Sequence, residues 1–568
     1  MNKRRQKKIP NKLASLPDDP DDSEVEGDIE SDEEESDVSS SSGDEDSSSS
    51  ENEDIDNAAN DLDWSKSTER LNLFDGIETD PELLFYLTNE TCEIEYFLSI
   101  FNENIVIKIV EETNRYAAQK ERNSSKTRRS SGSDNDWIEL TAKELKGWIG
   151  MNIFMAIHKL PSVDLYWSSD PALRVDAIAN VMTRNRFQKI TSMLHLNDNN
   201  NRVPKEDPMF DKLHKVRPLV EALNRSIKDV YKPSNLAAID ESMILFKGRS
   251  SLKQYNPMKP IKRGYKVWCL ADSITGFVSN FEIYAGKSEN KNSNDTLGER
   301  VVLNLTKGIL NTGTLVAFDN FFTSVKLVSS LHQKGIFSVG TVRANRIGLP
   351  IMMKEKSKMQ RGEYVFQRKG AVTAIKWMDA KPVTLLSSAH HPTVVTAVKR
   401  KTKTGNKIDV SCPLAVSSYN KIMGAVDKFD QLKERYSIGR RSRKWWHRIF
   451  YFLIDLAIVN SYIMYKVKNG DSKKTHLDFR VNLAKQLISN TTYRKRTGRP
   501  SSFVGKKINL LQEVRKDQFG KHVLQSIESR RRCRFCSTKE KEIRTKYVCK
   551  TCDVPLCVEP CFQKFHDS

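Results

Sequence analysis

The segment Ala237-Ala238-Ile239-Asp240-Glu241 joins a short apolar run to two carboxylates. Leu236 to Asp240 predicts a buried strand, because a short apolar run bounded by polar residues is typical of one. A second segment, Thr314 to Phe318, has the same character and is followed directly by Asp319. The sequence therefore predicts two strands that each end on an aspartate.

The residues around these segments alternate between strand-like and helix-like periodicity. The order of the elements is that of an RNase H-like core in an α/β multidomain chain, in which the first and fourth strands are neighbours. Asp240 and Asp319 are therefore expected to meet at one edge of the sheet. The predicted elements are, in order, the strands Leu236 to Asp240, Tyr265 to Ala271 and Phe277 to Ala285, a helix from about Leu297 to Leu310, the strand Thr314 to Phe318, a helix over Ser324 to Gln333, and the strand Ile336 to Val342.

A third acidic element lies in a helix predicted over Lys421 to Tyr436. Asp427 and Asp430 are three residues apart and share one helix face, so either can complete a metal site with Asp240 and Asp319. A single aspartate at a strand end is more often a turn or cap residue, and an aspartate pair on a helix is more often solvated. The joint arrangement favours two Mg²⁺ ions about 4 Å apart, as in phosphoryl-transfer sites.

Charge is unevenly distributed along the 568 residues. Residues 1–65 carry 6 Lys/Arg and 22 Asp/Glu, a net charge of −16, so the other 503 residues carry +35 of the total of +19. This excess exceeds what solubility requires and is typical of proteins that bind nucleic acid. The apolar run Ile449 to Tyr465 is interrupted by Asp455 and predicts a buried helix, so we expect no membrane partner.

Composition separates an acidic N-terminus from a helical region. Residues 1–65 are predicted to be disordered, because Ser, Asp, Glu and Asn bury too little apolar surface to offset chain entropy. Residues 66–232 are predicted to be mainly helical, with apolar residues at three-to-four spacing in Tyr96 to Val110 and Leu145 to His158. Beyond the core strands, a strand-rich segment from about Arg343 to Pro413 interrupts the element order.

Basic residues lie beside two tryptophans immediately after the acidic helix. Such a mixture grips phosphates while an aromatic ring stacks on an unstacked base, although packing in the core is an equally good interpretation for Trp446. Arg494 to Pro500 contains the Gly-Arg-Pro core of a minor-groove AT-hook, which is a weak signal. The candidate DNA contacts are Arg440, Arg441, Arg443, Lys444 and Trp445, together with Lys259, Lys262, Arg263 and Lys266 around the second strand.

Six of the nine cysteines lie in the last 36 residues of a chain without a secretory signal, which favours metal over disulfides. Two C-x2-C pairs at this separation are typical of zinc sites. Two tetrahedral ions need eight ligands, so we predict two interleaved structural Zn²⁺ sites in a RING/PHD-like cross-brace, with no partition assigned. If His522 is a surface residue, the second site has three protein ligands. The eight candidates are His522, Cys533, Cys536, Cys549, Cys552, Cys557, Cys561 and His566.

Five motifs lie in order along the chain: Ile239 to Glu241, Phe246 to Arg249, Gln254 to Pro260, Phe318 to Ser324, and Tyr419 to Gln431. Together they resemble the piggyBac transposases, at matching separations, and the resemblance runs from about residue 75 to the end of the chain. Lys247 and Ala425 depart from the usual residues of these motifs. Neither departure removes a metal ligand.

The resemblance implies that Asp240, Asp319 and Asp427 form a catalytic triad that binds magnesium, with Asp430 as an additional carboxylate and Trp445 near the reacting DNA end. It implies excision by 3′-hydroxyl attack, a hairpin on the transposon end, and scarless insertion at TTAA. The implied domains are a dimerisation and DNA-binding domain split between 66–232 and 438–515, a catalytic core split between 233–345 and 414–437, an insertion domain at 346–413, and a zinc-binding domain at 516–568.

The leading hypothesis is a nuclear, homodimeric cut-and-paste transposase that acts on terminal repeats in double-stranded DNA. One alternative is a domesticated derivative that binds specific DNA without transposing it, and another is a chromatin protein whose zinc module binds protein. The intact carboxylates favour the first. Basic clusters such as Lys3 to Lys8 are typical of nuclear import signals. The acidic N-terminus is expected to compete with DNA phosphate for the basic body.

Overall fold

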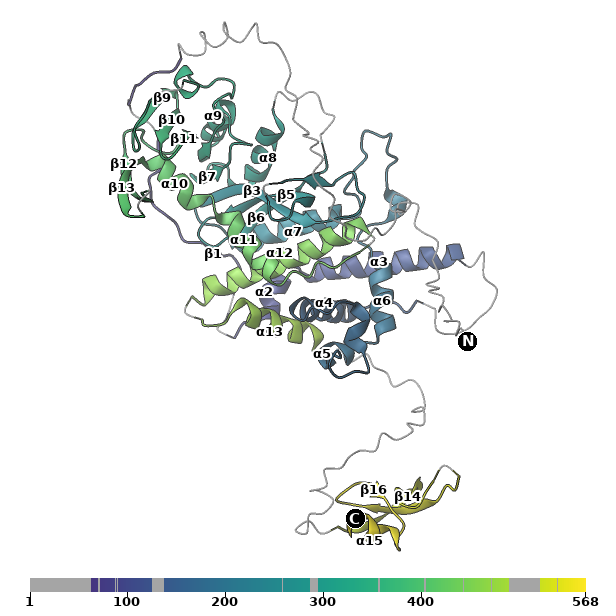
Figure 1. Ribbon diagram of the computed structural model, residues 1–568. Helices are drawn as coiled ribbons and strands as arrows, with labels where there is room; N and C mark the ends of the chain where they lie inside the picture. Colours follow the sequence, from purple (N-terminus) through teal and green to yellow (C-terminus); the bar gives the residue numbers. More distant parts are fainter. Residues whose placement is uncertain are drawn as a thin grey trace, which may run out of the picture. The chain divides into compact units, whose positions relative to one another are not determined.

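A computed structural model divides the chain into two compact units, Met1–Arg494 and Lys495–Ser568 (Figure 1). The predicted disorder of the N-terminus and the AT-hook-like segment lie outside the residues it describes, except for residues 63–65. The structure describes residues 63–69, 72–86, 88, 90–124, 137–257, 259–286, 295–355, 358–402, 405–442, 444–470, 472–489, 522–538 and 540–567.

The described part of the first unit contains α-helices as well as a central sheet. The periodicity predicted over Tyr96 to Val110 is divided between two helices, because Asn102 Oδ1 accepts a hydrogen bond from Ile105 N (3.1 Å) and caps the second one. The helices are α2 (Glu93–Ile100), α3 (Glu103–Ser124), α4 (Ala142–Ile157), α5 (Asp176–Ala179), α6 (Arg184–Met193), α7 (Arg217–Val230), α8 (Leu297–Leu305), α9 (Val325–Gln333), α10 (Leu414–Ile422), α11 (Ala425–Arg435), α12 (Trp445–Lys468) and α13 (His476–Ile488).

A nine-stranded sheet has the order β4-β5-β3-β7-β8-β11-β10-β9, with β6 paired to β5. β3 pairs antiparallel with β5 and parallel with β7, and β7 pairs parallel with β8. The prediction that the first and fourth core strands are neighbours is therefore confirmed. The strands are β3 (Leu236–Leu245), β4 (Gln254–Tyr255), β5 (Arg263–Asp272), β6 (Val278–Ile283), β7 (Leu315–Phe318), β8 (Phe337–Thr341), β9 (Tyr364–Lys369), β10 (Val372–Met378) and β11 (Pro382–Ser387).

Alternate side chains of the central strands contact helices on opposite faces of the sheet. Ile239 of β3 and Phe318 of β7 share a core cluster with α8 and α9. Ala238 and Ala317 belong to a second cluster, which includes α11 and α12. Because helices cover both faces (Figure 1), β3 and β7 begin as continuous apolar runs, as buried parallel strands do.

The strand-rich insertion extends the core sheet. The assignment of a separate domain to 346–413 did not anticipate this: β11 pairs antiparallel with β8, and β10 and β9 continue the same sheet. β12 (Val395–Lys401) and β13 (Lys407–Pro413) form a two-stranded hairpin of their own. The insertion therefore adds strands to one side of the sheet and a hairpin beside it.

The acidic helix predicted over Lys421 to Tyr436 is two helices. α10 ends at Ile422 and α11 begins at Ala425, with the break at Met423 and Gly424. Gly424 favours a break because glycine loses more backbone entropy in a helix than other residues do. Both predicted carboxylates of this element lie on α11.

The buried helix predicted at Ile449 to Tyr465 is confirmed as the centre of α12. α12 has the length and apolar composition of a membrane-crossing helix, but 83% of its most apolar window is buried within the fold. It contacts β3 as well as α2 and α13 (Figure 1). Asp455, which interrupts the apolar run, pairs with the equally buried Arg480 at 3.1 Å.

The second unit is small and has few apolar side chains. β14 (Leu524–Arg532), β15 (Arg544–Cys549) and β16 (Val554–Pro555) form a sheet, followed by α15 (Cys561–Asp567). Its buried cluster consists mainly of cysteines, with Val554 and Leu556. Such a core is too small to stabilise a fold of this size without another contribution, which metal binding supplies in small Cys-rich domains.

Candidate active site and metal clusters

Asp240 and Asp319 lie where β3 and β7 stop pairing. The last parallel pair of these strands is Ile239 with Phe318, and each aspartate is the next residue. The prediction that Asp240 ends its strand was wrong, because β3 continues to Leu245 and is held there by β5. The two aspartates nevertheless follow the same register position, as the strand order predicted.

Lys259, which the sequence assigned to DNA contact, binds the first of these carboxylates. Its Nζ lies 3.1 Å from Asp240 Oδ2. Burial raises the pKa of Asp240 to about 6, although Lys259 opposes the shift. Burial also raises the pKa of Asp319. A cation near the two carboxylates therefore stabilises their ionised forms.

Asp427 of α11 lies within electrostatic reach of Lys259. Asp240 continues the face of β3 that carries Ala238, and α11 covers that face. Burial lowers the pKa of Lys259, but the charges of Asp240, Glu241 and Asp427 raise it by more. Asp427 itself is exposed on its helix. The structure thus brings the third predicted carboxylate to the same lysine as the first.

Asp430 is engaged by other side chains. Its Oδ1 accepts hydrogen bonds from Ser242 Oγ (2.6 Å) and from the buried Lys433 Nζ (2.7 Å). Within the ranges that the structure describes, no three carboxylates have ligand oxygens that all lie within 4.8 Å of one another. The charges of Asp240, Asp319 and Asp427 therefore act on Lys259, but their carboxylates do not converge on one point.

Glu241 is a neighbour of the site to which the sequence analysis assigned no role. Its carboxylate accepts hydrogen bonds from Asn256 Nδ2 and from Lys266 Nζ (3.2 Å). Lys266, which was grouped with the DNA contacts, is therefore paired inside the protein. The sequence signal was present, because Glu241 directly follows Asp240 and Asn256 lies in the motif Gln254 to Pro260.

Several predicted DNA contacts between α11 and α12 turn toward the protein. The guanidinium carbon of Arg440 lies 5.6 Å from the ring centroid of Tyr166. Lys444 Nζ donates to a backbone carbonyl of α6 at 3.0 Å. Arg441 is exposed, whereas Arg443 lies outside the described residues. Two of the four basic residues of this run, Arg440 and Lys444, therefore contact the protein itself.

The two tryptophans differ in burial. Trp446 is 2% exposed, so packing in the core is the correct interpretation of this residue. Trp445 is half-buried and lies edge-on to Tyr265, with ring centroids 6.3 Å apart. Lys262 and Arg263, at the start of β5, remain exposed. The predicted contacts that stay available at the surface are Lys262, Arg263 and Arg441.

The eight predicted zinc ligands form two groups of four. In each group, the ligand atoms all lie within 4.8 Å of one another. The groups interleave along the chain. The first and third cysteine pairs form one group, and the second pair, which lies between them, joins the histidines that come first and last among the eight ligands. One group is His522, Cys549, Cys552 and His566, and the other is Cys533, Cys536, Cys557 and Cys561.

Distances within these groups fit tetrahedral zinc. Cys536 Sγ and Cys557 Sγ are 3.8 Å apart, which is about the edge of a tetrahedron with Zn–S bonds of ~2.3 Å and is too long for a disulfide. His566 Nδ1 faces the carbonyl of Phe562 at 2.7 Å, which leaves Nε2 toward Cys552 Sγ at 3.6 Å. His522 instead turns Nδ1 toward Cys552 Sγ at 3.4 Å.

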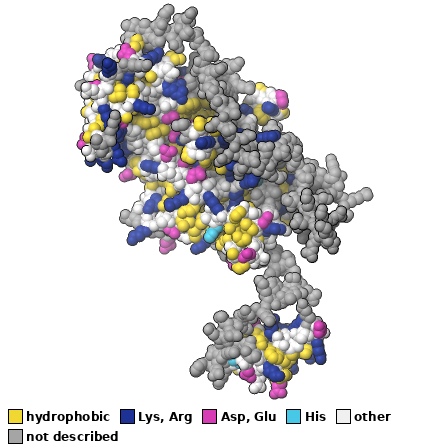
Figure 2. Space-filling model, in the orientation of Figure 1, with side chains coloured by type: hydrophobic (Ala, Val, Ile, Leu, Met, Phe, Trp, Pro, Cys, Tyr) yellow, Lys and Arg dark blue, Asp and Glu magenta, His cyan; other side chains and the backbone are white. Residues whose placement is uncertain are grey.

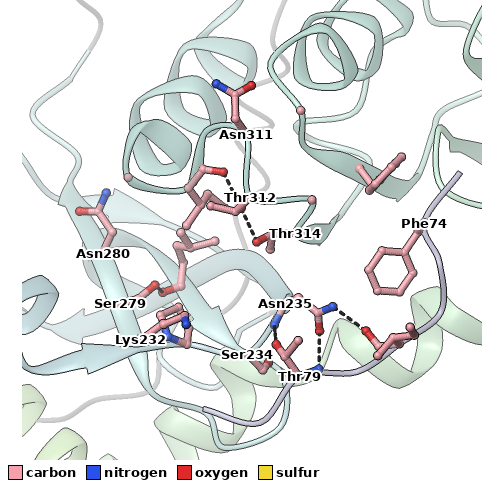
Figure 3. A pocket seen from close by; sticks show the side chains of 18 of the residues that line it. Phe74, Thr79, Lys232, Ser234, Asn235, Ser279, Asn280, Asn311, Thr312 and Thr314 are labelled. Carbon is pink, nitrogen blue, oxygen red and sulfur yellow. Dashed lines mark hydrogen bonds between the residues drawn. The ribbon is translucent and has the colours of Figure 1, made fainter. Parts of the chain in front are cut away.

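A cavity of about 890 Å³ lies away from the carboxylates (Figure 3). Asn235 and Thr314, which line it, precede the first residues of β3 and β7, so it opens at the opposite ends of these strands. Asn235 is fixed there by Thr79, whose N–H donates to its Oδ1 (2.9 Å). Phe74 packs edge-on against Phe337 beside it. The cavity therefore contributes nothing to the acidic site.

Known proteins share both units of this chain. A family model described as "Transposase IS4" matches residues 92–462, and one described as "DDE_Tnp_1-like zinc finger" matches residues 517–567. Relatives in Homo sapiens include PiggyBac transposable element-derived protein 2, 29% identical over 84% of this chain and 77% of the relative, and PiggyBac transposable element-derived protein 3, 27% identical over 89% and 81%.

A solved structure shows the same fold. It is a cryo-EM structure of a piggyBac transposase synaptic complex with hairpin DNA, which is 24% identical and has a TM-score of 0.66 over 85% of this chain and 98% of that chain. The first family model covers more than half of the 568 residues. The chain therefore belongs to the piggyBac-type transposase family and carries a C-terminal zinc-finger domain.

Proposed function

We propose that this chain is a cut-and-paste DNA transposase that cleaves and joins strands at transposon ends and inserts them at TTAA. The observation that carries the proposal is the placement of Asp240 and Asp319 directly after the last parallel pair of β3 and β7. The element order and strand order support an RNase H-like core. α11 adds Asp427 on the face of the sheet that Asp240 shares.

The donor set fits magnesium, which prefers carboxylate oxygens. The residues that would hold two such ions are Asp240, Asp319 and Asp427, and Lys259 at 3.1 Å from Asp240 already marks the site as one that attracts positive charge. Bound there, magnesium would supply activation of an oxygen nucleophile and stabilisation of the leaving oxygen at phosphorus. The chain's own residues orient the carboxylates: β3 and β7 fix two of them, and α11 presents the third.

Double-stranded DNA is the proposed partner. The +35 charge of residues 66–568 favours phosphate, and Lys262, Arg263 and Arg441 are exposed. The structural neighbour is a complex with hairpin DNA. We assign dimerisation and DNA binding to residues 66–232 and 438–515, with a homodimer acting on two transposon ends in the nucleus.

Two structural zinc ions are proposed for the second unit, one in each interleaved group. Their binding would hold β14, β15 and α15 together, because these elements share few apolar contacts. The basic residues Arg530, Arg531, Arg534 and Arg544 are exposed on this unit, which suits recognition of transposon-end DNA. A finger that binds protein instead is the competing function of the unit.

The test is excision of a reporter cassette flanked by the element's terminal repeats, with the intact chain compared with Asp319→Asn in magnesium. Scarless TTAA junctions produced by the intact chain alone would support the proposal. If both proteins bind the ends and neither excises, the chain is a transposase-derived DNA-binding protein, and the enzymatic proposal fails.

A further inference from the structure

The hairpin of β12 and β13 presents basic side chains to solvent. Exposed and half-buried residues alternate along β12, so one face of the hairpin points outward. Lys399 and Lys401 of β12 and Lys407 of β13 are exposed on that face. Figure 2 shows Lys and Arg side chains over this part of the molecule, at the left of the view. Among the described residues, no ion pair within 4.0 Å neutralises these three lysines.

Two of these lysines are placed unfavourably for the free protein. Lys401 and Lys407 are direct partners in the antiparallel register. Like charges in this relation destabilise a strand pair, and a two-stranded hairpin is itself only marginally stable. Asp409, on the same face, lies opposite Lys399 and offsets one charge. The end of the hairpin therefore keeps a net positive charge. A bound polyanion would stabilise the hairpin by offsetting the repulsion between its lysines.

The inner side of the hairpin is held against the core sheet. Arg400 Nε donates to Asp379 Oδ2 (2.9 Å), and Asp379 also accepts from Arg361 (2.7 Å). Trp377 Nε1 of β10 donates to the carbonyl of Ser411 on β13 (2.8 Å). These bonds fix the direction in which the outer lysines point. Binding through them would therefore require little ordering of the hairpin backbone.

Next to its lysines, the outer face of the hairpin carries small side chains. Ala397 and Ser411 are direct partners there, and both are exposed. The major groove of B-DNA admits a two-stranded β-ribbon, and small side chains let the ribbon's backbone approach closely. Lysines at the end of the ribbon then reach phosphates beside the groove.

We propose that the β12–β13 hairpin is a duplex-DNA-binding ribbon that contacts phosphates through Lys399, Lys401 and Lys407. The proposal rests on the transposase function proposed above and adds the insertion to its DNA-binding surface. The nucleic acid is favoured over an acidic protein segment because the ribbon combines a row of cations with a narrow face of small residues.

The test measures binding of the full chain to a duplex that contains TTAA, over a series of salt concentrations. Lys401→Gln/Lys407→Gln is compared with the wild type and with Lys307→Gln/Lys334→Gln. The second variant removes the same charge from exposed residues next to Gly308 and Gly335, which line the cavity at the other end of the sheet. The slope of log affinity against log salt should fall by about 2 in the ribbon variant and by less than half as much in the control.

Each outcome separates the possibilities. Equal slopes in the two variants would overturn the proposal that the ribbon binds DNA. The overall charge of the chain would then account for the salt dependence. If the change in salt slope caused by the ribbon variant disappears once residues 13–62 are deleted, the ribbon lysines bind the acidic N-terminus. This result would overturn the DNA proposal. A wild-type chain that binds no duplex would overturn the proposed function as well. The ribbon variant should unfold at or above the wild-type midpoint, because it removes a like-charge pair.

Discussion

Asp240 and Asp319 follow the last parallel residue pair of β3 and β7, and Lys259 Nζ lies 3.1 Å from Asp240. The strand register alone brings the two aspartates together, whereas the lysine comes from the segment between β4 and β5. Two half-buried carboxylates and one ammonium group leave an excess of negative charge at this edge of the sheet. This charge balance is the physical reason for proposing a cation at this site.

Replacement of Asp240 or Asp319 by Asn should lower excision by at least about 100-fold, because each removes an oxygen ligand from the proposed magnesium site. Binding of the transposon ends should change by less than about threefold, since neither residue contributes to the exposed basic surface. Asp229→Asn, an exposed residue on α7, is the matched control. Excision by Asp240→Asn at the control rate would rule out the assignment.

Asp430→Asn should destabilise the first unit, because it removes the nearer of the two carboxylates that pair with the 4%-exposed Lys433 and leaves only Glu434 Oε1 at 3.4 Å. Since Asp430 is itself partly exposed, the expected cost is about 1–3 kcal/mol of unfolding free energy. Lys433→Met in the same chain should recover part of this cost. Urea denaturation of the two single variants and the double variant measures the coupling, and purely additive effects would show that the pair is independent.

Chelation of zinc should unfold the second unit and leave the first intact. Cys533→Ser and Cys549→Ser should each lower the zinc content from two ions per chain, because they remove ligands from different groups. Cys92→Ser is the control, since Cys92 lies at the start of α2 and in neither group. Cobalt substitution distinguishes the groups, because four thiolates give stronger charge-transfer bands than two. Identical spectra for the two variants would contradict the partition.

The first unit should lose stability below neutral pH. Burial lowers the pKa of His195 to about 3 and of His476 to about 2. Below about pH 6.5 the unfolded chain therefore takes up protons that the fold excludes, at up to about 1.4 kcal/mol per pH unit for each histidine. Tryptophan fluorescence follows this unit alone, because all eight tryptophans precede Lys495.

His476→Gln tests this origin of the pH dependence. A glutamine oxygen can accept the hydrogen bond that His476 Nε2 receives from Arg480 Nε (3.0 Å) and has no proton to gain. The variant should show a shallower loss of stability between pH 7 and 5. An unchanged slope would mean that other groups dominate.

Deletion of residues 13–62 should raise DNA affinity at low salt. These residues carry 21 of the 22 Asp/Glu of residues 1–65 and no compensating lysine or arginine, a net charge of −21. They join the described fold at Trp64, which is buried, and at Ser65, which pairs with Arg368 of β9. A tethered anion competes with phosphate at short range, and salt screens it. Equal affinities with and without the segment at low salt would refute this competition.

Local patterns in the sequence were sufficient to locate β3 and β7 and to identify the eight Cys/His residues. The apolar runs before Asp240 and Asp319 identify strands buried on both faces, and the spacing from Cys533 to His566 is short enough for neighbouring thiols to share a metal. Both signals depend on residues close together in the chain, where periodicity and spacing are reliable guides. The ends of the elements were less predictable. β3 extends beyond its apolar run because β5 pairs with it, and the predicted acidic helix is interrupted at Gly424.

Only the tertiary structure decided which charged residues face DNA and which face the protein. Lys259 and Lys266 bind carboxylates, and Arg440 covers a tyrosine, although in the sequence they are indistinguishable from exposed Lys262 and Arg441. The extension of the core sheet by β11 was equally hidden. The charged side chains and the sheet extension share one physical reason. A long charged side chain and a free strand edge each bind a partner from a segment far away in the chain, and the spacing of residues in the sequence carries no information about that partner.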